Sequence, residues 1–156
     1  MKIRRAEDRD ISEILSLLSQ VLTVHHGIRP DLFKADTTKY NERELSALLT
    51  LEDRPVFVYE DDDGHIRGYG FCVIQTHPAD NILTDIKTLY IDDLCVDQAF
   101  RGTGVGSAIF SYIREYAKEN GCYNITLNVW EGNDRAISFY DSLGFTPYKY
   151  GMEILL

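Results

Sequence analysis

The sequence lacks long apolar runs and clusters of basic residues, and each absence excludes a class of function. No apolar stretch approaches the roughly 18 residues that cross a membrane, and none of signal-peptide length follows the start MKIRRAEDRD. We therefore expect a cytoplasmic protein with no membrane partner. Lysine and arginine total 16 against 25 acidic residues, for a formal net charge of −9. Because phosphate backbones are bound by clustered cations, no nucleic-acid partner is expected; a cationic or neutral partner is favoured, although acidity also serves solubility alone.

Cysteine is scarce as well. The sequence has three cysteines, Cys72, Cys95 and Cys122. Because their number is odd and their spacing is not that of metal ligands, we expect reduced thiols in a cytoplasm. The acidic run Asp61 to Asp63 lacks the spacing and the distal Glu of a calcium loop, and a solvated turn is expected there. No metal site is predicted.

The apolar patterns predict one mixed α/β domain over residues 1–156, without internal repeats or linkers. Apolar residues at helical spacing predict helices at about 11–22, 39–49, 105–117 and 133–143. Alternating or β-rich runs predict strands at about 2–5, 55–60, 66–74, 86–96, 123–129 and 148–156. The stretch from His25, which contains Gly27 and Pro30, is expected to be a loop. The chain is thus expected to end on a strand.

Three glycines stand between a predicted strand and a predicted helix, in the segment DQAFRGTGVGS. Gly102, Gly104 and Gly106 precede or open the helix, where unpaired N–H groups and the positive end of the helix dipole attract an anion. Arg101 adds a planar cation suited to phosphate oxygens. A pyrophosphate is the expected guest, unless the glycines serve the turn alone. Ser107 stands where a Rossmann fingerprint needs Gly, and the Lys of a Walker loop is absent, so neither a dinucleotide nor a nucleotide triphosphate is favoured.

One face of the last predicted helix carries Asn133, Ala136 and Tyr140, at positions i, i+3 and i+7. These residues span roughly 10 Å, so a linear ligand could lie along them. Asn133 could hydrogen-bond an amide of that ligand, Ala136 permits close approach, and Tyr140 offers a phenolic proton. The alternative is a core face with Asn133 as the helix cap.

Two motifs together, QAFRGTGVG and NDRAISFYDSLGF, resemble the signature motifs of the GNAT superfamily of N-acetyltransferases. The combination is far more specific than either motif alone. The predicted order of elements also matches the fold of that family from the first strand to the last. The resemblance implies a twisted, mostly antiparallel sheet of six to seven strands flanked by about four helices.

The resemblance further implies an enzyme that binds acetyl-CoA and transfers its acetyl group directly to a primary amine. The backbone of Leu94 to Val96 would pair with the pantetheine arm, and the N–H groups from Gly102 to Ser107 would hold the pyrophosphate. Tyr140 would protonate the leaving thiolate as general acid, a role that suits a pKa of about 10. The residues implied in coenzyme binding are Leu94, Cys95, Val96, Arg101, Gly102, Thr103, Gly104, Val105, Gly106, Ser107, Asn133, Ala136 and Tyr140.

A general base is also needed, because an amine must lose a proton before it attacks a thioester. Asp92 and Asp93 lie just upstream of the coenzyme-binding backbone, and in a regular strand their side chains point to opposite faces. Asp92 would then share a face with Leu94 and Val96, unless a bulge intervenes. We predict Asp92 as the base and both acids as substrate-binding; the alternative is that both form salt bridges or solvate the strand.

The acceptor is less defined. YIDDLCV and WEGN are most similar to the diamine and polyamine acetyltransferase branch, and the negative charge agrees with a polyamine; another small amine, or a peptide or lysine amine, stays open. A catalytically silent regulatory module that only binds acyl-CoA is the alternative function, and Tyr140 argues for catalysis. His25 and His26 are expected on a loop surface rather than as the base. Cys95 is expected to pack in its strand, which disfavours a ping-pong mechanism. Dimers are common among proteins of this kind, so a homodimer is among the expectations.

Overall fold

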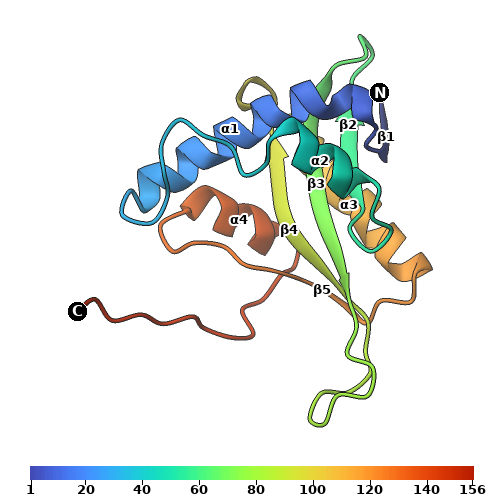
Figure 1. The fold of residues 1–156 in the computed structure, drawn as a ribbon, viewed down its shortest axis with the longest axis vertical. Helices are drawn as coiled ribbons and strands as arrows, with labels where there is room; N and C mark the ends of the chain where they lie inside the picture. The colour runs from blue at the N-terminus through green and yellow to red at the C-terminus, as the bar shows by residue number, and fades with distance from the viewer.

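The computed structural model describes all of residues 1–156 and consists of one sheet with helices on both faces (Figure 1). The sheet has five strands in the order β1-β2-β3-β4-β5, namely β1 (Lys2–Arg5), β2 (Val56–Glu60), β3 (Ile66–Gln75), β4 (Thr88–Val96) and β5 (Asn124–Leu127). Neighbours are antiparallel from β1 to β4, while β5 runs parallel to β4. The predicted fold class is confirmed, but the number of strands is five rather than six to seven.

Four helices accompany the sheet: α1 (Ile11–Ile28), α2 (Glu42–Leu49), α3 (Val105–Glu119) and α4 (Asp134–Ser142). Helix α1 is longer than predicted and includes His25 and Gly27. It ends before Arg29, because the residue before a proline disfavours the helical conformation. Helix α2 begins later than predicted, at a capping box in which Asn41 and Glu44 bond each other's backbone N–H groups. None of the helices combines the length and the apolar character needed to span a membrane.

The core has two parts, one on each face of the sheet. Helices α1 and α2 bury Ile14 and Leu45 against one face, and α3 buries Ile109 and Ile113 against the other. Helix α3 lies directly on β3, since a Cβ atom added at Gly70 would stand only 2.6 Å from the Ile113 side chain. Every buried residue lies at or before Ala117. The last quarter of the chain, which includes β5 and α4, therefore has only partly covered side chains.

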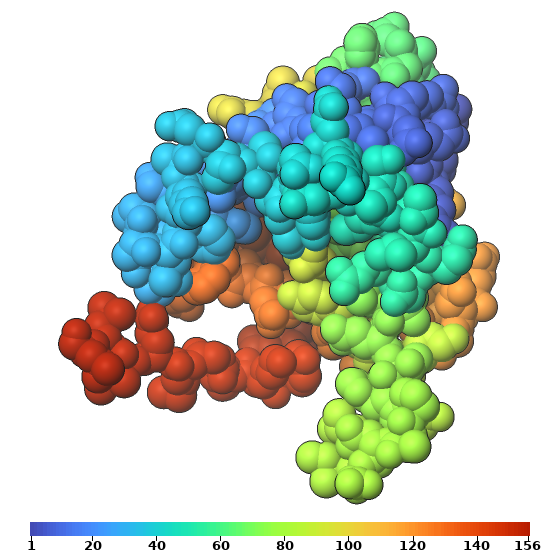
Figure 2. Space-filling view, viewed as in Figure 1, coloured from blue at the N-terminus to red at the C-terminus, as the bar shows by residue number.

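The predicted strand at 148–156 is absent from the structure. Residues 146–156 are exposed throughout, and none of their backbone groups bonds to the rest of the chain. Figure 2 shows this C-terminal segment standing away from the body of the molecule. The prediction was wrong for the single chain because a strand needs a neighbouring strand to satisfy its N–H and C=O groups, and none lies beside this segment.

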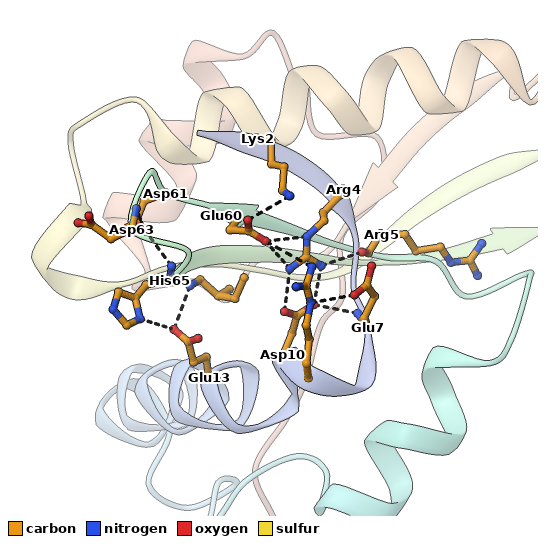
Figure 3. A network of polar contacts seen from close by, with 12 residues as sticks. Lys2, Arg4, Arg5, Glu7, Asp10, Glu13, Glu60, Asp61, Asp63 and His65 are labelled. Carbon is orange, nitrogen blue, oxygen red and sulfur yellow. Dashed lines mark hydrogen bonds and ion pairs between the residues drawn. The ribbon is translucent and has the colours of Figure 1, made fainter.

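The β1 edge of the sheet is closed by ion pairs. Arg4 donates to both carboxylate oxygens of Asp10, at 2.7 and 2.8 Å, and its Nε donates to Glu60 at 2.8 Å. Figure 3 shows these side chains converging from β1, from β2 and from the turn before α1. Lys2 adds a second cation 3.2 Å from Glu60. Charged side chains on an edge strand discourage the addition of another strand.

Candidate active site

Strands β4 and β5 separate partway along their length. Their pairing runs from Thr88 opposite Asn124 to Ile91 opposite Leu127 and then ends, while β4 continues to Val96. Residues 92–96 of β4 consequently have no strand on the β5 side. Leu94 to Val96, the backbone predicted to pair with an extended ligand, lies on this open edge.

The glycine loop follows immediately after β4. Gly102 and Gly104 have φ values of +80° and +92°, which side-chain-bearing residues rarely adopt, and Gly104 is the N-cap of α3. Val105, Gly106 and Ser107 supply the first N–H groups of α3, and none of these groups donates a hydrogen bond to another part of the chain. A helix start with free N–H groups and no capping side chain is suited to an anion.

Arg101 lies half-buried at the same loop. Its Nε donates to the Val96 carbonyl at 3.0 Å, so this side chain links the loop to the open end of β4. Arg101 thus supplies a cation in the loop that precedes the start of α3, in agreement with an anion site. The Val96 carbonyl, in contrast, already has a donor within the chain, which the sequence could not reveal.

Helix α4 packs against the start of α3. A Cβ atom at Gly106 would lie 3.1 Å from the Phe139 ring, so the third glycine of the loop permits this approach. Asn133 caps α4 by accepting a hydrogen bond from the Ala136 N–H at 3.3 Å, which is the capping alternative considered above. The amide of Asn133 thus has a structural role, and its role toward a ligand stays a prediction.

Tyr140 stands on α4 between two aromatic rings, 5.3 Å from Phe139 and 5.6 Å from Phe145. Burial, and then the nearby Asp93 and Cys95, raise the pKa of the Tyr140 phenol above the value of about 10 assumed above. The phenol therefore stays protonated at neutral pH. Its hydroxyl is not the donor of any hydrogen bond within the chain, so its proton can be donated to a ligand.

A bulge in β4 decides where the two acids lie. Phe71 of β3 pairs with Asp93, and the next residue of β3 pairs with Ile91, so Asp92 has no partner residue opposite. Leu94 and Val96 pack on the α3 side of the sheet. Asp92 instead contacts Lys39, just before α2, so the exception foreseen for a bulge applies and the face expected for a regular strand does not.

The two acids have different partners. Lys39 Nζ donates to Asp92 at 2.6 Å, and although burial alone would lower the Lys39 pKa, this carboxylate raises it. Tyr69 donates its hydroxyl proton to Asp93 at 2.9 Å. Burial nevertheless raises the pKa of Asp93 to about 6. Asp93 thus accepts a hydrogen bond from Tyr69, and its charge contributes to the raised pKa of Tyr140, while the assignment of Asp92 as the base stays a prediction.

Sequence reasoning missed Lys39 and Tyr69. Tyr69 pairs with Cys95 across the β3–β4 ladder, so only the strand register could have placed its ring beside Asp93. Lys39 lies in the segment between α1 and α2, which carries no pattern that links it to β4. Both residues reach the acids through tertiary contacts alone.

The histidines and Cys95 do not form an alternative catalytic pair. His25 packs on the Phe33 ring at 5.1 Å, and its burial lowers its pKa; His26 Nδ1 lies 2.7 Å from the Phe33 carbonyl. Cys95 is buried, and burial raises the pKa of its thiol to about 12. Because the thiolate is the nucleophilic form, this thiol is suited to packing.

Comparisons with known proteins agree with this geometry. Residues 21–145 match the model of the acetyltransferase (GNAT) family. A crystal structure of a mutant BH1408 protein from Bacillus halodurans is 36% identical, with a TM-score of 0.96 over 100% of this chain and 99% of that chain.

Two curated relatives are acetyltransferases by name. Thialysine N-epsilon-acetyltransferase of Sus scrofa is 28% identical over 91% of this chain and 82% of that protein. Glucosamine 6-phosphate N-acetyltransferase of Trypanosoma brucei brucei is 31% identical over 65 residues, which are 42% of each chain. The family match covers most of the sequence, including the glycine loop and α4, so the chain belongs to the GNAT family of acetyltransferases.

Proposed function

We propose that this protein transfers an acetyl group from acetyl-CoA directly to the primary amine of a small molecule. The observation that carries the proposal is the open edge of β4: it holds the buried carboxylate of Asp93, which is near enough to the free phenol of Tyr140 on α4 to raise its pKa. At its Val96 end, that edge continues through the glycine loop to the free N–H groups of α3. The three free cysteines fit a reducing, cytoplasmic compartment.

The residues on both sides of the opening fit acetyl-CoA. No strand pairs with Leu94 to Val96 on the β5 side, so this backbone can receive an extended amide-bearing arm if Arg101 releases the Val96 carbonyl. The N–H groups of Val105, Gly106 and Ser107, with Arg101 beside them, suit a pyrophosphate. Both parts are present in the free chain, and the rearrangement required is the exchange of the Arg101 hydrogen bond at the Val96 carbonyl.

We assign the acid-base roles to the two groups that lie together. Asp93 has a pKa of about 6, near the pH at which an amine acetyltransferase would operate, so its carboxylate can accept the ammonium proton of the acceptor. The neutral amine then attacks the thioester carbonyl, a C–N bond forms and the C–S bond breaks. Tyr140 donates its proton to the thiolate that leaves, and the proton that the nitrogen loses as the amide forms restores the phenol. Asp92 remains the alternative base. Its carboxylate already binds the Lys39 ammonium, so a cationic group of the acceptor could take the place of Lys39 there.

The acceptor is an aliphatic amine that carries positive charge. Asp92 and Asp93 supply two carboxylates near the reaction centre, and the relative from Sus scrofa is named for acetylating the terminal amine of a lysine analogue. A diamine, a polyamine or a lysine-like amino acid meets these requirements. A peptide or lysine amine, which the sequence left open as acceptor, would need the same two carboxylates to bind its positive charge.

The test is titration calorimetry with acetyl-CoA, followed by thiol release in the presence of diamines, polyamines, lysine analogues, aminoglycosides and peptides. We expect binding and turnover with at least one cationic amine. Binding without turnover on any amine would instead favour a regulatory module, and no binding would exclude the anion site at α3.

A matched pair of variants locates the coenzyme. Gly104 and Gly121 flank the two ends of α3, both have positive φ, and a Cβ atom at either would have no neighbour within 4 Å. Gly104→Ala and Gly121→Ala therefore introduce similar backbone strain. Only Gly104→Ala should weaken acetyl-CoA binding, by about tenfold or more, because only that glycine shapes the loop of free N–H groups. Equal weakening in both variants would contradict the assigned site.

A further inference from the structure

Arg101 is a half-buried cation without an acidic partner. The other half-buried arginines of the chain all form ion pairs with carboxylates; they are Arg4, Arg5, Arg29 and Arg67. Arg101 forms none, and its one hydrogen bond within the chain runs from Nε to the Val96 carbonyl at 3.0 Å. The two terminal nitrogens of its guanidinium donate to no group of the chain. A partly desolvated cation in this state can bind an anion that the chain does not supply.

The carbonyl that Arg101 binds lies on the open edge of β4. The N–H of Asp97 donates to the Arg67 carbonyl at 2.9 Å. Val96 pairs with Gly68 at the same point of the ladder between β3 and β4. In an antiparallel pair this pattern is that of a non-hydrogen-bonded position, so the N–H and C=O of Val96 point away from β3. The Arg101 guanidinium therefore occupies the place from which an extended ligand would donate to Val96.

A ligand arm that pairs with this edge must first displace Arg101. Removing the guanidinium from the Val96 carbonyl leaves a half-buried cation without an acceptor, which is costly. A diphosphate at the start of α3 offers charged acceptors in exchange, and such hydrogen bonds are about twice as strong as neutral ones. Arg101 directly precedes the glycine loop, where a Cβ atom at Gly102 or Gly104 would have no neighbour within 4 Å. The loop thus leaves room for the anion that would draw Arg101 away.

We propose that Arg101 exchanges the Val96 carbonyl for the diphosphate of the acyl donor and thereby restricts the donor to thioesters of coenzyme A. The inference rests on the proposed use of acetyl-CoA. Both ends of the coenzyme bind the state in which Arg101 has left Val96, so each end raises the affinity for the other. A donor that has the pantetheine arm without the diphosphate must displace Arg101 unaided. Acyl-pantetheine, or a carrier-protein thioester with a single phosphodiester, is therefore disfavoured.

The test measures the dissociation constants of coenzyme A and of pantetheine, which is the same arm without phosphates, by NMR titration. Arg101→Met keeps the apolar stem of the side chain but removes the guanidinium. We expect its dissociation constant for coenzyme A to rise about tenfold and that for pantetheine to fall about threefold, because the arm no longer displaces a hydrogen bond. Arg43→Met removes an equal charge from the exposed surface of α2 and should change neither constant.

The opposite signs separate this exchange from two simpler roles of Arg101. A guanidinium that only attracts phosphate would weaken coenzyme A binding and leave pantetheine unaffected in the comparison, whereas one that only holds the loop in shape would weaken both. Either result would overturn the proposal, as would the absence of pantetheine binding to Arg101→Met. A parent protein that does not bind coenzyme A would overturn the proposed function itself, and this inference with it.

A second measurement needs no substitution. The carbonyl ¹³C resonance of Val96 and the ¹⁵N resonance of Arg101 Nε report the hydrogen bond between these two groups. Inorganic diphosphate alone should shift both resonances in the parent protein, since it binds the guanidinium and offers no donor to the carbonyl. Shifts confined to the N–H groups at the start of α3, or no shifts at all, would show that Arg101 stays on Val96 and would contradict the exchange.

Discussion

A carboxylate shielded from solvent lies near each end of the sheet, and the surroundings shift the pKa values of the two carboxylates in opposite directions. At the β1 end, burial alone would raise the pKa of Asp10, but hydrogen bonds from Arg4 and from the Glu7 N–H outweigh it and lower the pKa. At the β4–β5 end, burial raises the pKa of Asp93 to about 6 although Tyr69 donates to it. One acid is stabilised in its charged form, and the other is held in a place where its charge is costly.

This difference separates a structural end of the molecule from a functional one. Asp10 is 4% exposed, and its charge is fully satisfied by Arg4 and by a backbone N–H. Asp93 lies beside an open strand edge and near a phenol that has no hydrogen-bond acceptor. Acids whose charge is poorly compensated occur at sites where proton transfer is needed.

The largest effect is expected at the closed end. Arg4→Met leaves the Asp10 carboxylate buried without its cation, so the free energy of unfolding should fall by about 3 kcal/mol. Urea denaturation measures this change. Arg5→Met is the control, because its partner Glu52 is 92% exposed and such a pair contributes at most about 1 kcal/mol. Similar losses in both variants would show that the ion pairs of β1 are equivalent, contrary to the geometry.

The next effect is expected on catalysis at the open end. Tyr140→Phe removes only the phenolic proton, so kcat should fall about 100-fold while acetyl-CoA affinity and stability stay nearly unchanged. Thiol release and calorimetry measure the two properties. Tyr112→Phe is the control, because its ring contacts Phe57 of β2, outside the opening. Unchanged turnover in Tyr140→Phe would remove this residue as the acid.

The third prediction applies one substitution to both acids. Asp93 has a folded-state pKa above its ordinary value of 3.8, so its contribution to stability is lost as the pH rises from about 4 to about 6. Asp93→Asn should therefore stabilise the protein by about 2 kcal/mol at pH 8 and reduce activity. Asp10 has a lowered pKa, and its contribution is present above pH 3.8 and is lost in acid. Asp10→Asn should accordingly destabilise the protein at pH 8.

Denaturation of both variants from pH 4 to pH 8 checks these signs. Loss of stability in Asp93→Asn at pH 8 would mean that the Tyr69 hydrogen bond compensates the charge. Kinetics provide the second check, since kcat/KM of the parent should decline below about pH 6 if Asp93 is the base. A decline that persists in Asp93→Asn, but not in Asp92→Asn, would return the role to Asp92.

Sequence patterns predicted the elements of the site better than the contacts between them. The glycine loop and Tyr140 belong to local motifs, so their placement on a strand–loop–helix unit and on α4 followed from spacing. The bulge at Asp92 did not, because it depends on how β4 pairs with β3. The ion pair of Lys39 with Asp92 joins residues that are 53 positions apart.

The C-terminal segment shows another limit of the same kind. The alternation from Tyr148 to Leu156 predicted a strand, but Leu155 interrupts the alternation and the segment has no neighbouring strand. A pattern of apolar residues carries no information on whether a neighbouring strand is present. The strand count was wrong for that reason.

The smallest effect is expected at Lys39, which lies at the border of the open end. Its side chain is 44% exposed and that of Asp92 is 29% exposed, so Lys39→Gln should change the free energy of unfolding by less than about 1 kcal/mol. The substitution frees Asp92 to bind a cation of the acceptor. The KM for a polyamine should then fall by about threefold, while the KM for a monoamine stays the same. Lys34→Gln, in the same segment, removes an equal charge and should change neither KM. A higher polyamine KM in Lys39→Gln would show that Lys39 positions Asp92 rather than occupying the place of a substrate ammonium.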